Sequence, residues 1–204
     1  MGAHMAQTTT SSGGHEPGHG MALLIVDMIS CWDFPDAAPL LAQALRVAPN
    51  IAALRQRCRR AGMPVVYAND NRGQWRSDFR TLIRAALECG GPGARIARTL
   101  APAEDDFFVL KPMHSAFFAT PLELLLRHLG VRALILTGVS SDQCVLHTAG
   151  DARMRDYEVI IPADCVATES APRNRRAIAH FEQVMNVQTT ASARVRLPRR
   201  APRR

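Results

Sequence analysis

Short apolar runs of strand length alternate with longer stretches of helical periodicity along most of the chain, and this alternation restricts the fold most strongly. The expected strands are MALLIVD, PVVYAN, DFFVL, VRALILTG, YEVIIPAD and MNVQTT. The expected helices span residues 37–60, 77–88, 120–129, 143–155 and 172–185. Runs such as ALLIV and ALILTG are apolar throughout, which indicates strands buried on both faces. The pattern therefore predicts a single three-layer α/β/α domain, Rossmann-like, with a mainly parallel six-stranded sheet.

The two ends of the chain differ in composition from this domain. Residues 1–19 are rich in Gly, Ser and Thr and begin with MGAHM, so we expect a disordered N-terminal segment that includes an expression tag. Residues 191–204 contain six arginines and no acidic residue, which accounts for most of the formal charge of +7. We expect these residues to form a basic, disordered tail, and residues 20–190 to form the folded domain.

Charge, hydropathy and cysteine content limit the classes of partner. Without the basic tail the chain is nearly neutral, which argues against a specific nucleic-acid footprint on the folded domain. No uninterrupted apolar run approaches the roughly 18 residues that a membrane span needs. The cysteines have neither CxxC nor Cys/His ligand spacing, which is typical of reduced thiols: Cys31, Cys58, Cys89, Cys144 and Cys165. We therefore expect a cytoplasmic protein that binds a small molecule and neither nucleic acid nor membrane.

Three residues that could carry chemistry fall at the carboxyl ends of expected strands, where parallel sheets of this kind place their ligand crevice. Asp27 follows ALLIV, Lys111 follows DFFVL, and Cys144 lies in TGVSSDQC, where a strand turns into a helix. Taken singly, each has an ordinary explanation as a capping carboxylate, a surface lysine or a small buried thiol. Together they place a nucleophile, a cation and a carboxylate at one edge of the sheet. A helix N-terminus and a nearby lysine are expected to lower the pKa of the Cys144 thiol.

These residues lie in longer segments that resemble the isochorismatase-like cysteine hydrolase superfamily. The resemblance covers residues 21–190, with matching segments LLIVDM, FVLKPMHSAFFATPLELLLRHLGVRALILTGVSSDQCVLHTAGDA and YEVIIPADCVAT. It implies a catalytic triad in which Cys144 is the nucleophile, Asp27 the acid/base and Lys111 the cation that polarises and holds the site. It also implies a cis peptide bond between Val139 and Ser140, with the amides of Ser140 and Cys144 forming an oxyanion hole.

The resemblance further implies a reaction that needs no cofactor. Asp27 takes the thiol proton, Cys144 attacks an amide or ureido carbonyl, Asp27 returns the proton to the leaving amine, and water hydrolyses the thioester. Two alternatives stay open. One is vinyl ether cleavage of the isochorismatase type, and the other is a non-catalytic oligomeric binding protein. Because relatives assemble, a homodimer or homotetramer is expected by resemblance.

The region after the second expected strand departs from the metal-binding members of the family. Nicotinamidases bind a metal there through an Asp and histidines, but VVYANDNRGQWRSDF contains no histidine, so no metal is expected. Asp70 is a conceivable ligand, but without histidines nearby we expect it to be a turn residue that hydrogen-bonds its own backbone. The NDNRGQW pattern with RSDF resembles a subgroup of uncharacterised hydrolases. Aromatic residues that follow the strands are expected to line the substrate pocket: Trp32, Phe34, Trp75, Phe117 and Phe118.

Two other interpretations are disfavoured by spacing. His147 could act as the base, but it lies three residues after Cys144 on the same expected helix, which displaces it along the axis. A dinucleotide-binding dehydrogenase shares the α/β pattern, but no GxGxxG follows the first strand. The GGPG run at 90–93 is expected to be a loop.

Overall fold

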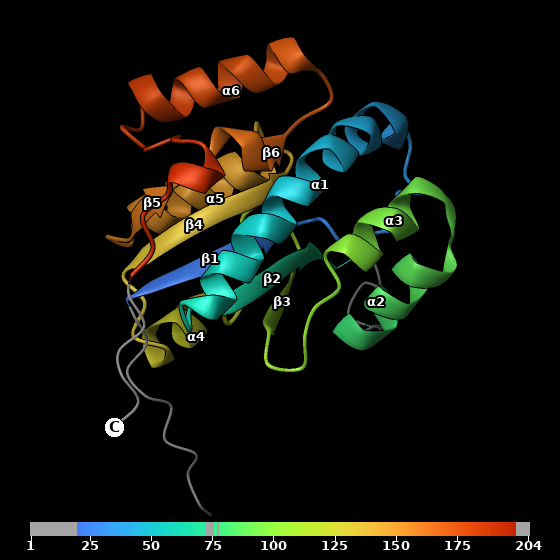
Figure 1. Cartoon of the computed structure of the whole chain (residues 1–204), viewed down its shortest axis with the longest axis horizontal. Helices are drawn as coiled ribbons and strands as arrows, with labels where there is room; N and C mark the ends of the chain where they lie inside the picture. Colours follow the sequence, from blue (N-terminus) through green and yellow to red (C-terminus); the bar gives the residue numbers. More distant parts are fainter. Residues whose placement is uncertain (1–19, 72–75, 77, 199–204) are drawn as a thin grey trace, which may run out of the picture.

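A parallel β-sheet runs through the centre of the computed structural model, which describes residues 20–71, 76 and 78–198 (Figure 1). Its strands are β1 (Met21–Val26), β2 (Val65–Asp70), β3 (Phe107–Lys111), β4 (Ala133–Val139), β5 (Glu158–Ile160) and β6 (Val166–Ala167). They lie in the order β3-β2-β1-β4-β5, with β6 also paired to β4, and each of these pairings is parallel. The expected six-stranded parallel sheet is confirmed.

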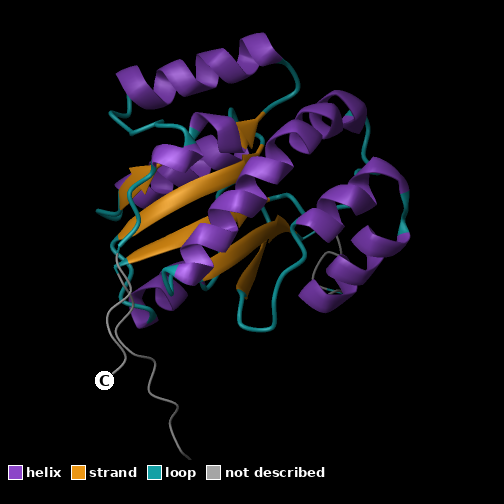
Figure 2. Ribbon diagram, viewed as in Figure 1, coloured by secondary structure: helices purple, strands orange, loops and turns teal. Residues whose placement is uncertain are grey.

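Helices cover both faces of this sheet, as the ribbon in Figure 2 shows. One face carries α1 (Ala37–Arg60), α2 (Phe79–Glu88) and α3 (Gly91–Thr99), and the other α4 (Leu122–His128), α5 (Cys144–Arg153) and α6 (Ala171–Gln183). Side chains of a strand point alternately to its two faces, so β1 contributes to both cores. Leu23 and Ile25 lie in the core under α1, whereas Leu24 and Val26 lie in the core under α5. The three-layer α/β/α prediction is therefore correct.

Helix α1 is long and apolar enough to cross a membrane, with a mean hydropathy of 1.2, and is the one such helix among the residues described. Its apolar side nevertheless packs against the sheet, where Ala44, Ile51 and Leu54 are buried in the first core. Its polar side reaches the rest of the domain, since Arg55 donates to the Tyr67 hydroxyl at 2.6 Å. This division is that of an amphipathic helix covering a sheet.

Two expected elements differ from the structure. MNVQTT forms only an isolated bridge, between Gln188 and Ile160, and the sixth strand is β6, which follows the 3₁₀ turn Ala163–Cys165. The MNVQTT segment does not become a strand because it pairs with β5 only at Ile160, the last residue of that strand. The GGPG run is not a loop but the start of α3, with Gly90 as its N-cap at φ 72° and a proline in the first helical turn. Proline suits that position because the first turn needs no intrahelical N–H bond.

The predicted disordered tail is wrong for its first residues, which pack against α1. Arg57 donates to the carbonyls of Ser192 at 2.5 Å and Val195 at 2.8 Å. The Asp164 carboxylate accepts from the Ser192 amide at 2.7 Å and the Ser192 hydroxyl at 2.8 Å. Val195 is buried in the first core. Composition suggested disorder, but Val195 and Leu197 pack against the first core and Ser192 is hydrogen-bonded among the arginines, which together anchor the segment. Residues 1–19 and 199–204 lie outside the described residues.

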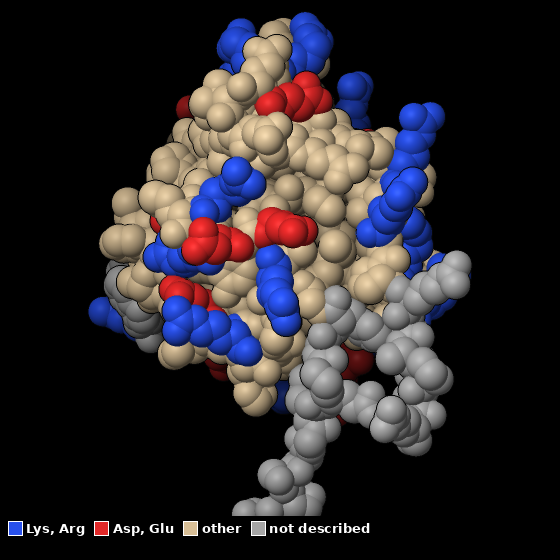
Figure 3. All heavy atoms as spheres, turned by 90° about the vertical axis from the view of Figure 1, so that its left-hand side faces the viewer, with Lys and Arg blue, Asp and Glu red and all other residues tan. Residues whose placement is uncertain are grey.

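Acidic and basic side chains are interspersed on the face that Figure 3 shows, and no field of one sign covers it. The described residues include several ion pairs that neutralise arginines locally. Glu123 pairs with both Arg127 and Arg155, and Arg155 also pairs with Asp151 at 3.0 Å. These ion pairs offset part of the positive charge of the arginines.

Gly138 allows β4 to lie close to β1 and should not tolerate a side chain. It has φ +106°, and a Cβ there would lie 2.0 Å from the carbonyl oxygen of Val26. We expect Gly138→Ala to lower the free energy of unfolding by at least about 3 kcal/mol, because two paired backbones would have to separate. Guanidinium unfolding followed by circular dichroism measures this loss. Gly150→Ala is the matched control, since its Cβ meets nothing within 4 Å. Equal stability of the two variants would contradict the prediction.

The packing of Ser192 and Val195 predicts where the chain can be shortened. We compare a protein that ends at residue 198 with one that ends at residue 191. The shorter protein loses the hydrogen bonds to Arg57 and Asp164 and the burial of Val195. Its free energy of unfolding should therefore be about 3 kcal/mol lower. Urea denaturation of both proteins tests this, and coincident unfolding curves would refute the described anchoring.

Candidate active site

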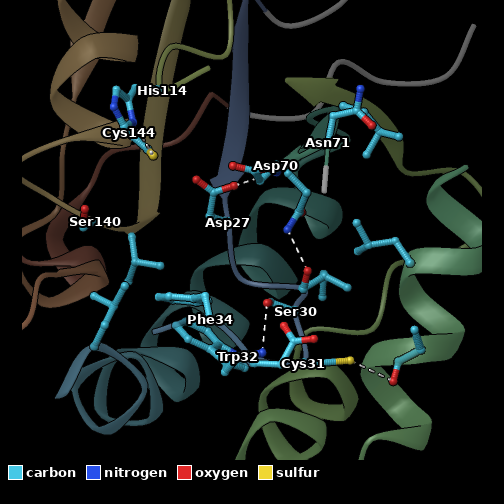
Figure 4. Close-up of a pocket in the computed structure, with 18 of the residues that line it drawn as sticks. Asp27, Ser30, Cys31, Trp32, Phe34, Asp70, Asn71, His114, Ser140 and Cys144 are labelled. Carbon is cyan, nitrogen blue, oxygen red and sulfur yellow. Dashed lines mark hydrogen bonds between the residues drawn. The ribbon is translucent and has the colours of Figure 1, made fainter. Parts of the chain in front are cut away.

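The ends of four neighbouring strands bring Asp27, Lys111 and Cys144 to one edge of the sheet. Asp27 follows β1, Lys111 ends β3, and Cys144 begins α5 a few residues after β4. Asp27 adopts φ 53°, and its amide donates to the carbonyl of Ala68 on β2 at 2.9 Å. This turn of the backbone ends β1 and directs the carboxylate toward the neighbouring strand ends (Figure 4).

Asp27 and Lys111 form a buried ion pair. The ammonium of Lys111 lies 2.8 Å from Oδ2 of Asp27, with 1% of the lysine side chain and 17% of the aspartate side chain exposed. Oδ1 of Asp27 accepts from the amide of Asp70 at 2.8 Å, and the ammonium also donates to the carbonyl of Met113 at 3.3 Å. Burial lowers the pKa of Lys111, but the charges of Asp27 and Cys144 outweigh it and raise the pKa overall. Lys111 is therefore a fixed cation.

The sulfur of Cys144 lies 3.5 Å from the ammonium of Lys111. The pKa of the thiol is raised to about 12, mainly by burial and also by the charge of Asp27 and a hydrogen bond to it, while Lys111 opposes both causes. The expectation of a lowered pKa is therefore wrong, because desolvation of a thiolate outweighs the lysine and the helix N-terminus. With this pKa Cys144 is a thiol at neutral pH, so a role as nucleophile would need a base that accepts its proton.

His114 is a site residue that sequence reasoning missed. Its Nδ1 lies 3.8 Å from the Cys144 sulfur, and its exposed ring lies at the rim of the site. His147, considered as a rival base, stacks on the ring of His114 with centroids 5.3 Å apart, and its Nδ1 lies 2.8 Å from the carbonyl of Gln143. The only signal in the sequence was a histidine three residues after Lys111, and no periodicity in that loop indicates its direction.

Asp27, His114 and Cys144 line a cavity of about 380 Å³, shown in Figure 4. Its apolar wall is formed by Ile29, Trp32, Phe34, Leu40, Leu82 and Leu110. Its polar lining includes Ser30, Asp33, Asn69, Asp70, Asn71, Ser140 and Gln143. The size and the mixture of an apolar wall with convergent polar groups are those of a small-molecule site.

The structure brings two of the aromatic residues expected in the substrate pocket to this cavity. Trp32 and Phe34 line the cavity, with ring centroids 6.2 Å apart. Phe117 and Phe118 do not: Phe117 is buried in the second core, under the guanidinium of Arg155, and Phe118 is 56% exposed. Their loop is anchored to α5 by the Ala116 amide, which donates to a threonine hydroxyl there, and this turns Phe117 into the core.

The turn between β4 and α5 contains the cis peptide bond, Val139–Ser140, that the resemblance implies. The carbonyl of Ser140 accepts from the amides of Gln143 and Val145, each at 3.1 Å, and so closes the turn that leads into α5. Ser140 and Cys144 both line the cavity. Because Cys144 is the first residue of α5, its amide lies in the turn whose N–H groups have no intrahelical partner.

The loop before Cys144 is held from outside the cavity by Asp142. Its carboxylate accepts from the Thr168 hydroxyl at 2.6 Å and pairs with Arg173 of α6 at 2.7 Å. These bonds lower the pKa of Asp142 although burial opposes them. The start of α5 is therefore fixed to the segment that follows β6.

Within the described ranges, no group of three His, Cys, Asp or Glu side chains is arranged to hold a metal ion. Asp70, considered as a lone ligand, ends β2 and donates its amide to Asp27. Trp75 and most of the NDNRGQW pattern lie outside the part of the chain that the structure describes.

Comparison with known proteins gives consistent matches. Residues 21–193 match the isochorismatase domain family. The chain is 37% identical over 175 residues to the uncharacterised isochorismatase family protein YaaI of Bacillus subtilis (strain 168), covering 85% of this chain and 95% of YaaI. It is 36% identical over 157 residues to enterobactin synthase component B of Escherichia coli (strain K12), covering 72% of this chain and 52% of that protein. The fold matches the crystal structure of N-carbamoylsarcosine amidase from Thermoplasma acidophilum with a TM-score of 0.69 and 28% identity, over 87% and 99% of the two chains.

The charges around Cys144 predict opposite effects of two substitutions on its alkylation. Iodoacetamide reacts with the thiolate already present at equilibrium and needs no proton transfer to Asp27. Asp27→Asn removes a charge that raises the thiol pKa, so near neutral pH this thiolate fraction is larger and Cys144 should be alkylated about tenfold faster than in the wild type. Lys111→Met removes the charge that lowers it, so alkylation should be about tenfold slower. Peptide mass spectrometry follows Cys144 separately, with the exposed Cys89 as an internal control of constant rate. Slower alkylation in Asp27→Asn would contradict the assigned electrostatics.

Proposed function

Because the chain belongs to the isochorismatase-like family of cysteine hydrolases, we propose that it hydrolyses an amide or ureido C–N bond of a small molecule through a thioester on Cys144. One observation carries the proposal: the Cys144 sulfur lies 3.5 Å from Lys111, whose ammonium is paired with Asp27 at 2.8 Å, in the wall of a cavity of about 380 Å³. The similar N-carbamoylsarcosine amidase is by name an enzyme of C–N bonds, which supports the reaction class.

Asp27 is the base and then the acid of thioester formation. As the sulfur attacks the carbonyl carbon, Asp27 accepts the thiol proton, and the carbonyl oxygen becomes an oxyanion near the amides of Ser140 and Cys144. When the intermediate collapses, the C–N bond breaks and Asp27 donates the proton to the leaving nitrogen. The raised pKa of the Cys144 thiol supports proton transfer during the attack, because the sulfur is uncharged before the substrate binds.

Lys111 stays protonated throughout and serves two partners. Its ammonium holds Asp27 in place at 2.8 Å and lies 3.5 Å from the sulfur, where it stabilises negative charge that develops during attack. Because 1% of its side chain is exposed, water does not screen this interaction.

The cavity favours a substrate with an apolar or planar portion. The rings of Trp32 and Phe34 lie at the end away from Cys144 in Figure 4, and Leu82 and Leu110 complete the wall. A volume of about 380 Å³ limits the substrate to a small molecule. We therefore propose that the acyl group lies against the aromatic wall while the carbonyl faces the sulfur.

Vinyl ether cleavage is the second candidate, favoured by the match to a domain family named for isochorismatase. An acid and a cation suffice for that reaction, and Asp27 and Lys111 supply both. The two functions differ in their need for the thiol. Ether cleavage would persist in Cys144→Ala, whereas amide hydrolysis through a thioester would not.

A panel of primary amides, ureido acids and nicotinamide tests the proposal, with ammonia release as the signal. We expect turnover of at least one compound by the wild-type protein and a loss of at least about 10³-fold in both Cys144→Ala and Cys144→Ser, because the nucleophile is removed. A rapid acid quench followed by mass spectrometry should show the acyl group on the Cys144 peptide.

Cys89→Ala provides the matched control, since Cys89 is an exposed thiol outside the cavity lining. Its turnover should equal that of the wild type. Full turnover in Cys144→Ser would exclude the thioester, and retained cleavage of isochorismate in Cys144→Ala would establish the ether reaction instead.

A further inference from the structure

We propose that His114 is a second catalytic residue, which acts as the base for hydrolysis of the thioester, while Asp27 serves its formation. The inference rests on the proposed function, because it assigns the second half of that reaction. It arises from the surroundings of the sulfur, where His114 is the one described imidazole in contact with the nucleophile.

The sulfur lies between two different proton acceptors. Figure 4 shows Cys144 with His114 on one side and Asp27 on the other. Nδ1 of His114 lies 3.8 Å from the sulfur, within the distance of a hydrogen bond to sulfur. A water molecule that attacks a carbonyl carbon bonded to this sulfur on the His114 side would meet Nδ1 directly.

Asp27 and His114 differ in their existing hydrogen-bond partners and in their exposure to solvent. Both carboxylate oxygens of Asp27 have partners, since Oδ2 pairs with Lys111 at 2.8 Å and Oδ1 accepts from the Asp70 amide at 2.8 Å. His114 is exposed at the rim, where water enters and where an imidazole can exchange its proton with solvent. The exposed position of His114 therefore suits activation of a water molecule. The largely buried position of Asp27 suits proton transfer from the thiol to the leaving group.

The ring of His147 stacks on the ring of His114 and supports it. A carbonyl oxygen can only accept, so the 2.8 Å contact between Nδ1 of His147 and the Gln143 carbonyl places a proton on that nitrogen. This bond holds the His147 ring against the preceding turn, and the His114 ring stacks on it with centroids 5.3 Å apart. His147 is thus a positioning residue for His114.

Two proton transfers through His114 accompany hydrolysis of the thioester. Water attacks the thioester carbon and transfers a proton to Nδ1 of His114, which forms a C–O bond and an imidazolium. The tetrahedral intermediate then expels the sulfur, the C–S bond breaks, and the imidazolium returns its proton to the sulfur. The products are a carboxylic acid and the thiol of Cys144, and His114 is again neutral. The 3.8 Å separation makes this return transfer direct.

Acetylation by p-nitrophenyl acetate isolates this half-reaction, since p-nitrophenolate leaves without a proton from Asp27. Mass spectrometry of the Cys144 peptide then follows the decay of acetyl-Cys144. We expect the acetyl group to persist about 100-fold longer in His114→Ala than in the wild type, the size of a lost general base. Free imidazole should restore much of the decay in His114→Ala but not in His114→Phe, whose ring fills the space.

Two further variants separate catalysis from structure. His147→Ala should slow the decay by a smaller factor, because His114 keeps its imidazole but loses its support. His180→Ala replaces an exposed histidine on α6 and should leave the decay unchanged. Equal decay in His114→Ala and the wild type would overturn the role of His114 alone. Absence of acetyl-Cys144 in both the wild type and His114→Ala would overturn the proposed nucleophile and this inference with it.

Discussion

The carboxylate of Asp27 and the ammonium of Lys111 lie 2.8 Å apart and are both largely withdrawn from water. Their strands are not neighbours, because β2 lies between β1 and β3, so the pair bridges an intervening strand whose last amide also bonds Asp27. Removing either partner would leave a buried charge, at a cost of about 3–5 kcal/mol. Gly138 brings β4 against β1 on the other side, which sets the distance from this pair to the start of α5.

In the proposed mechanism, this pair explains how a thiol with a pKa of about 12 can act as a nucleophile. A cysteine with a lowered pKa is present as thiolate at neutral pH and reacts with any accessible electrophile. Cys144 instead stays neutral until a carbonyl occupies the cavity, because burial penalises the thiolate more than Lys111 favours it. In that mechanism, attack on a bound carbonyl depends on Asp27 as the base, and Lys111 holds Asp27 in place at 2.8 Å. Selectivity for bound substrate follows from this arrangement.

The sequence predicts the position of residues that are placed by the sheet, and it does not predict the position of residues that are placed by loops. Asp27, Lys111 and Cys144 follow apolar strands, so the parallel pattern predicts that they share an edge. His114 and Phe117 belong to one loop, and whether each points to the cavity or the core depends on the anchor of that loop to α5, which has no periodic signature. The raised pKa of the Cys144 thiol could not be predicted either, because the positions of residues in the sequence indicate which charges lie nearby but not how deeply the thiol is buried.

The GGPG run shows how a segment remote from the chemistry can define the cavity wall. A Cβ at Gly93 would lie 2.7 Å from Cδ1 of Trp32, so the indole occupies space that only a glycine on α3 leaves open. The Ser30 hydroxyl accepts from the Trp32 amide at 3.0 Å and holds the backbone of the same turn. The reactive end of the cavity is thus fixed by the sheet, whereas its aromatic end is fixed by a loop and a helix. Substrate preference can therefore change through this second end while Asp27, Lys111 and Cys144 keep their positions.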